Sequence, residues 1–195
     1  MFSAVSKVGS AAANVASSLH LPGTAKKETG FSEDQAFNHI KAITQISSSA
    51  QQTPLFQFVL DESESIKKTA KGEVKVEVDR VPAKHGDSVV LRVLPKYASE
   101  AKEHNDILVS AHIDTTKMVL LFGAKDDVYN REGAGDDSSS VAVMLELARG
   151  LSQSASGLKH AVIFLFNTGE DEGLNGSHSF ITQVSNYFSI YISFN

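Results

Sequence analysis

The chain has 195 residues, of which 42% are hydrophobic and 21% are charged, a balance typical of one globular domain with a buried core. It contains no cysteine, which excludes disulfides, thiolate metal sites and cysteine nucleophiles, so any metal must be held by His, Asp or Glu. The formal net charge of −5 gives no electrostatic reason to expect a nucleic-acid partner. No apolar run approaches the roughly 18 residues that would span a membrane.

Residues 1–30 come before the first regular pattern. The first 27 residues contain three lysines and no acidic residue, and they are rich in serine and alanine. This composition allows two interpretations: a disordered tail, or a weakly transit-like segment that would direct the chain to a plastid or mitochondrion. The absence of arginine favours the tail.

Two helices are predicted next. Ser32 and Gln35 form a capping-box pattern, and apolar residues then recur at helical spacing over 33–46. A loop over 47–54 leads to a second predicted helix over 55–71. Both helices are amphipathic, so each is expected to bury one face.

Strand patterns follow these helices. Residues 73–79 alternate strictly between apolar and polar side chains, which is typical of a half-buried strand. The remaining predicted elements are strands over 88–94, 106–111 and 161–166 and helices over 140–150 and 173–183. Strand 106–111 is short and continuously apolar, so we expect it to be central and covered on both faces. Two strands flanking the helix at 140–150 predict a βαβ unit, with the early strands on the outer side of an α/β sheet.

Three polar clusters follow strand ends or precede a helix, where open α/β sheets bind their ligands. They are His112–Ile113–Asp114, Asp136–Asp137 and Glu170–Asp171–Glu172. His112 and Asp114 are two apart on extended chain, so their side chains point to the same side. This suits an imidazole metal ligand supported by a carboxylate. A hydrogen-bonded histidine at a strand end is the plainer alternative.

The three consecutive acids from Glu170 would repel one another at the end of a strand. A bound divalent cation relieves such repulsion, with one carboxylate as a ligand and its neighbour taking a proton from the metal-bound water. The plainer alternative is a solvated loop whose acids favour the N-terminus of the next helix.

Together, the motifs SAHID, GAGDDSSS with its helix VAVMLELARG, and NTGEDEGLNGSHSF resemble the di-zinc aminopeptidase-type metallopeptidase family. The resemblance is greatest to endoplasmic reticulum metallopeptidase-like proteins, particularly those of plants. It implies a mixed, mostly parallel sheet sandwiched by helices, as in zinc aminopeptidases of the phosphorylase/hydrolase-like fold. The partial peptidase domain would cover residues 31–183.

The resemblance also implies a role for each matching residue. His112 corresponds to a zinc ligand. Asp114 corresponds to the carboxylate that supports this histidine, and it is counted among the catalytic residues. Asp136 corresponds to the aspartate that bridges two zinc ions. Asp171 stands where the family normally has a glutamate ligand. Glu170 corresponds to the general base that activates the metal-bound water.

The implied reaction is hydrolysis of a peptide bond, usually one that releases an N-terminal residue. The implied location is the endoplasmic reticulum, where relatives are membrane-anchored. A related di-zinc amidohydrolase or carboxypeptidase is the neighbouring alternative, because it shares the same metal ligands.

Three features depart from the family pattern. An apparent insert over 117–131 contains a first GA-x-DD copy, whose Asp126 is the alternative to Asp136 as the bridging ligand. Asp171 is one methylene shorter than glutamate. An uncharged tail over 184–195 replaces the region where the family supplies a further carboxylate and a late histidine.

These departures predict a domain that is incomplete at its C-terminus, with an open sheet edge through which copies could self-associate. They also leave a second functional hypothesis open. In it the chain is a catalytically inactive, truncated form of such a peptidase that is inert or acts by binding.

Overall fold

The computed structural model describes residues 30–47, 52–82, 87–96, 106–114, 137–156, 158–170 and 173–184. The elements in these ranges are α2 (Glu33–Ser47), α3 (Gln52–Thr69), β1 (Val74–Val81), β2 (Ser88–Pro95), β3 (Ile107–His112), α4 (Ser138–Ser154), β4 (Val162–Asn167) and α5 (Asn175–Val184). Each helix and strand predicted from the sequence is confirmed, with small differences at the ends.

The strands form a mixed sheet in the order β1-β2-β4-β3. β1 pairs with β2 and β2 with β4 in antiparallel fashion, whereas β3 and β4 are parallel. A parallel pair needs a crossover connection, and α4 lies in that connection, so the predicted βαβ unit is confirmed. Within the described residues the parallel pairing is confined to β3 and β4, so the expected predominance of parallel pairs is not seen there.

The position of β3 differs from the prediction. In the described part of the chain this strand lies at one edge of the sheet, with 56% of Ile107 and 37% of Leu108 exposed. A continuous apolar run indicates that a strand can be buried on both faces, but it does not specify which strands lie beside it. Of the early strands, which were expected on the outer side, β1 lies at the other edge of the described sheet and β2 lies inside it, between β1 and β4.

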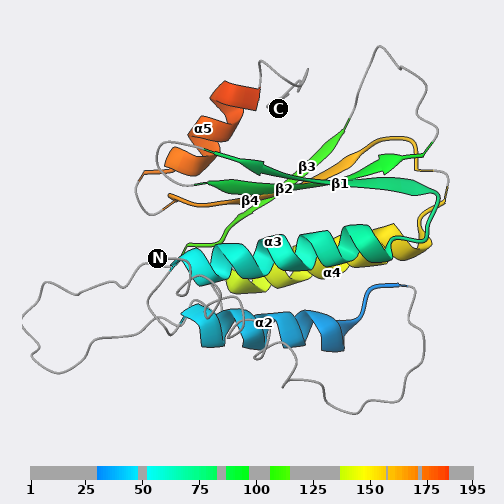
Figure 1. Cartoon of the computed structure of the whole chain (residues 1–195), viewed down its shortest axis with the longest axis horizontal. Coiled ribbons are helices and arrows are strands. Elements are labelled where there is room, and N and C mark those ends of the chain that lie inside the picture. The colour runs from blue at the N-terminus through cyan, green and yellow to red at the C-terminus, as the bar shows by residue number, and fades with distance from the viewer. Residues whose placement is uncertain are drawn as a thin grey trace, which may run out of the picture.

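Helices cover both faces of the sheet. Figure 1 shows α3 and α4 beside each other on one face, α2 beyond them as an outer layer, and α5 on the opposite face. The larger core packs β2 side chains such as Leu91 against α3 and α4. The smaller core contains Val90, Ile163, Leu165 and Phe180 and packs α5 onto the sheet. The α/β sandwich is therefore confirmed.

None of the helices within the described ranges combines the length and the apolar character that crossing a membrane requires.

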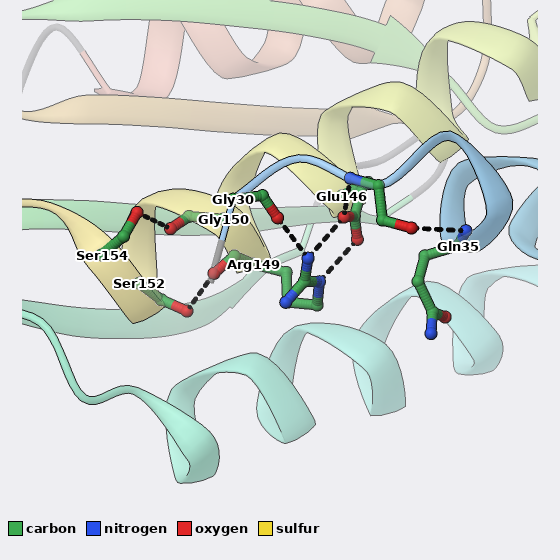
Figure 2. Close-up of polar contacts among 8 residues, drawn as sticks. Gly30, Gln35, Glu146, Arg149, Gly150, Ser152 and Ser154 are labelled. Atoms are coloured by element: carbon green, nitrogen blue, oxygen red, sulfur yellow. Dashed lines mark hydrogen bonds and ion pairs between the residues drawn. The ribbon is translucent and has the colours of Figure 1, made fainter. Parts of the chain in front are cut away.

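A buried ion pair fastens the start of α2 to α4 (Figure 2). Glu146 is fully buried and accepts a hydrogen bond from the Ser32 backbone N–H at 2.7 Å. Arg149 donates to both Glu146 carboxylate oxygens and to the Gly30 carbonyl, each at 2.6 Å. The Ser32 hydroxyl accepts from the Gln35 N–H at 3.3 Å, as the capping pattern predicts. Because this buried charge is paired and hydrogen-bonded, the outer helix is held in one place without an uncompensated carboxylate.

His39 of α2 faces the same ion pair. Its ring meets the Phe58 ring edge-on, with centroids 6.2 Å apart. Burial lowers the pKa of His39 below its ordinary value, and the charge of Arg149 acts in the same direction while Glu146 opposes both. The lowered pKa favours the neutral form of His39 at this partly buried interface between α2 and its neighbours.

Candidate active site

His112 is the last residue of β3 and is held by the chain that follows it. Its Nδ1 lies 2.8 Å from the Asp114 carbonyl oxygen. A carbonyl can only accept, so Nδ1 must donate and the lone pair of the ring lies on Nε2. This is the tautomer in which a histidine binds a metal through Nε2.

The Asp114 carboxylate joins the ends of β3 and β4. Asp114 is 2% exposed, and its Oδ2 accepts hydrogen bonds from the backbone N–H groups of Gly169 at 2.9 Å and Glu170 at 3.0 Å. Its Oδ1 lies 3.7 Å from His112 Nδ1 and is buried with no hydrogen-bond partner among the described residues. One carboxylate therefore contacts both the candidate ligand and the segment that carries the candidate base.

Glu170 lies in the loop between β4 and α5. The preceding Gly169 has φ 79°, a left-handed conformation that favours glycine and turns the chain sharply at the end of the strand. The Glu170 carbonyl accepts from the N–H groups of Gly173 at 3.0 Å and Leu174 at 2.9 Å. The backbone of Glu170 is thus fixed on both sides, while its side chain is partly exposed to solvent.

The start of α4 lies beside His112. His112, Ile113, Asp137, Ser138 and Val141 line one hollow together with apolar residues of the two preceding helices, Ile43 and Leu55. The Ser138 hydroxyl is buried with no hydrogen-bond partner in the described ranges. Asp137, which directly follows Asp136 in the chain, therefore lies beside the candidate ligand His112.

Two of the five predicted site residues, Asp136 and Asp171, lie outside the described residues, as do the predicted insert over 117–131 and the tail beyond Val184. Among the residues that are described, no three His, Asp or Glu side chains gather as a metal site. The structure brings the Asp114 carboxylate against the His112 imidazole and the Glu170 backbone N–H, and the functional roles of all five residues remain predictions.

Sequence reasoning missed one polar residue at this end of the sheet. Asn167 is the last residue of β4, is 2% exposed and is hydrogen-bonded through its side chain to β3 and α5. An amide that ends an otherwise apolar strand was the available signal, because a buried polar side chain needs partners.

Comparisons with known proteins show the family to which the chain belongs. Residues 92–195, more than half of the chain, match the model of Peptidase family M28. The chain is 57% identical to human endoplasmic reticulum metallopeptidase 1 over 58 residues, which cover 30% of this chain and 6% of that protein. It is 40% identical to the mouse endoplasmic reticulum metallopeptidase 1 over 96 residues, covering 49% of this chain and 9% of the relative. The particular likeness to plant members remains a prediction.

The fold has solved counterparts. The LapA aminopeptidase of Legionella pneumophila superposes with a TM-score of 0.63 at 18% identity, over 97% of this chain and 44% of that one. At this identity the likeness concerns the fold alone. The chain thus spans less than half of this structural neighbour and less than a tenth of the two metallopeptidases.

Proposed function

This chain belongs to peptidase family M28, and we propose that it carries the zinc-dependent active site of an aminopeptidase-type peptidase. The observation that carries the proposal is the double contact of Asp114. Its Oδ2 accepts from the Gly169 and Glu170 N–H groups, and its Oδ1 lies 3.7 Å from the imidazole of His112. A candidate metal ligand and the backbone of a candidate base are thereby held at one end of the sheet, and metal-assisted hydrolysis needs a ligand and a base close together.

The donor set suits zinc. His112 would hold a zinc ion through Nε2, Asp136 would be shared by two ions and Asp171 would bind the second, and zinc accepts the nitrogen and oxygen atoms that these side chains offer. The buried Asp114 Oδ1 supports this assignment, because a nearby cation would offset the cost of an unpartnered carboxylate oxygen. Zinc, when bound, supplies polarisation of the scissile carbonyl and a lowered pKa of the attacking water.

The residues of the chain perform the proton transfers in this proposal. Glu170 takes a proton from the attacking water and delivers it to the leaving amine, as a general base and then a general acid. Asp114 acts as a positioning residue, because it fixes the Glu170 backbone and the end of the strand that carries His112. The substrate is a peptide with a free N-terminus.

We expect the purified chain to bind zinc through His112 and to hydrolyse an aminoacyl 4-nitroanilide in a zinc-dependent manner. A chelator should abolish turnover, and added zinc should restore it. Replacing His112 with alanine should lower zinc affinity by at least tenfold. The matched control is His160→Ala, because His160 is exposed just before β4, at the other end of that strand.

Zinc content by metal analysis and turnover by absorbance distinguish the outcomes. If the chain binds no zinc and shows no turnover, the peptidase proposal is wrong for this chain and the catalytically inactive form, inert or acting by binding, is favoured. If His112→Ala and His160→Ala bind zinc equally well, His112 is not a ligand.

The location of the chain in the cell is proposed from the names of its relatives. Several of them are named endoplasmic reticulum metallopeptidases, and we propose the endoplasmic reticulum for this chain on that resemblance. A plastid or mitochondrion is the alternative from the composition of residues 1–30. A fluorescent fusion of the complete chain distinguishes them.

We also propose that two copies associate through β3, which lies at one edge of the sheet formed by the described residues. Ile107 and Leu108 are exposed on opposite faces of this strand, and a hydrophobic edge strand is a template for a further strand. A charge on such an edge blocks pairing, so Ile107→Lys should weaken self-association by at least tenfold in sedimentation velocity. Ile181→Lys is the control, since Ile181 of α5 is exposed to a similar degree at 46%. A chain that stays monomeric, or equal effects of the two variants, would refute this interface.

A further inference from the structure

Asn167 connects three elements around the candidate active site. It ends β4 in parallel register with His112, the last residue of β3. Residues in register on neighbouring strands point to the same face of a sheet, so the Asn167 amide lies on the face that His112 occupies.

Three polar groups of Asn167 have three different partners. Its Nδ2 donates to the Ser177 hydroxyl of α5 at 3.1 Å. Its Oδ1 accepts from the Ser110 hydroxyl of β3 at 3.4 Å. Its backbone carbonyl accepts from the Ile113 N–H at 2.9 Å. A neutral amide provides a donor and an acceptor at once, which neither a carboxylate nor an apolar side chain can do.

The loop that carries Glu170 runs from Asn167 to the start of α5. At its first end Glu170 is held by Asp114, and at its second end the Asn175 N–H donates to the Gly169 carbonyl at 2.9 Å. A movement of α5 along the sheet would therefore carry the Glu170 loop with it. The bond between Asn167 and Ser177 opposes this movement.

We propose that Asn167 is a positioning residue that sets the place of Glu170 relative to His112 by tying α5 to the ends of β3 and β4. The proposal rests on the proposed function for its catalytic meaning and on the contacts above for its geometry. A displacement of about 1 Å at a catalytic group can lower a rate by about 10²-fold. The buried amide of Asn167, which precedes Glu170 in the chain, can therefore affect turnover without touching the substrate.

The test uses three variants of the complete chain. Asn167→Leu removes both side-chain hydrogen bonds, and Ser177→Ala removes only the bond to α5. The matched control is Ser179→Ala, a serine on the same helix and partly exposed like Ser177. The first readout is amide hydrogen exchange at Gly169 and Glu170, whose N–H groups donate to Asp114.

We expect exchange at these two amides to accelerate about fivefold in Ser177→Ala, which loses one hydrogen bond, and by more than that in Asn167→Leu, which loses two, since one net hydrogen bond contributes about a factor of five in an opening equilibrium. Amides of β2 should keep their protection, which separates local displacement from a general loss of stability. Unchanged exchange at Gly169 and Glu170 in both variants would overturn the proposal.

The second readout is a comparison of kcat with KM at saturating zinc. We expect kcat to fall about tenfold in Asn167→Leu with KM and zinc stoichiometry unchanged, and Ser179→Ala to behave like the parent chain. A parent chain without turnover would refute the proposed function. The exchange data would then test only whether Asn167 holds the Glu170 loop in place. Normal kcat despite accelerated exchange would overturn the positioning role in the reaction.

Discussion

Replacing Glu170 with glutamine is expected to lower kcat by about 10²- to 10⁴-fold, the range that a positioned general base contributes. Glutamine has nearly the same shape but cannot take a proton from water. The Glu170 N–H bond to Asp114 Oδ2 and the two bonds to the Glu170 carbonyl involve only the Glu170 backbone. The substitution should therefore leave the fold and the loop in place.

The measurement is steady-state hydrolysis together with zinc content and circular dichroism. Zinc binding and the far-ultraviolet spectrum should match those of the parent chain. Glu64→Gln is the matched control, because Glu64 lies on α3, where its side chain is 37% exposed and pairs only with Lys67 among the contacts of the described residues. A Glu170→Gln chain that retains more than about a third of its activity would assign the base to another group.

Replacing Gly176 with alanine is expected to destabilise the fold by about 3 kcal/mol or more, because inserted atoms in a packed site cost about 1–3 kcal/mol when side chains can relax. In this protein the atoms that obstruct the added methyl group belong to the backbone of Thr168. A Cβ on Gly176 would lie 1.7 Å from the Thr168 carbonyl oxygen and 2.9 Å from its carbonyl carbon. The first turn of α5 can fit an alanine only by moving away from the end of β4.

Urea unfolding gives the free energy of unfolding of this variant. Gly30→Ala is the control, since a Cβ on Gly30 would have no heavy atom within 4 Å, and its effect should stay within about 0.5 kcal/mol. Because α5 follows the Glu170 loop, the Gly176 variant should also lose activity when it remains folded. An unchanged urea midpoint for Gly176→Ala would contradict the close approach of α5 to Thr168.

The helices and strands could be predicted from the sequence because their signals are local. Alternation over 73–79 predicted β1, and helical spacing after Ser32 predicted α2, since side-chain periodicity follows directly from backbone geometry. The βαβ unit was predictable for the same reason, because its helix and its two strands follow one another along the chain. The edge position of β3 was not, because an apolar run carries no information on which strand lies beside it.

The candidate site likewise combines residues that local patterns predicted with contacts that only the tertiary structure shows. The motifs predicted His112 and Glu170 as functional residues because three motifs in order resemble one family, although each motif alone has a plainer explanation. Asp114 was predicted to support His112, but its bonds to the Gly169 and Glu170 N–H groups join residues 55 and 56 positions apart in the chain. No local pattern contains such a contact.

The sequence by itself therefore determined the elements, the α/β class and the chemical types of the site residues, all of which depend on neighbouring positions. Only the tertiary structure decided how Asp114 and Asn167 connect β3, β4 and α5, and how Glu146 holds α2 in the outer layer. Those contacts depend on which buried polar groups meet when distant segments pack, and each buried group must find its partner there because water is excluded.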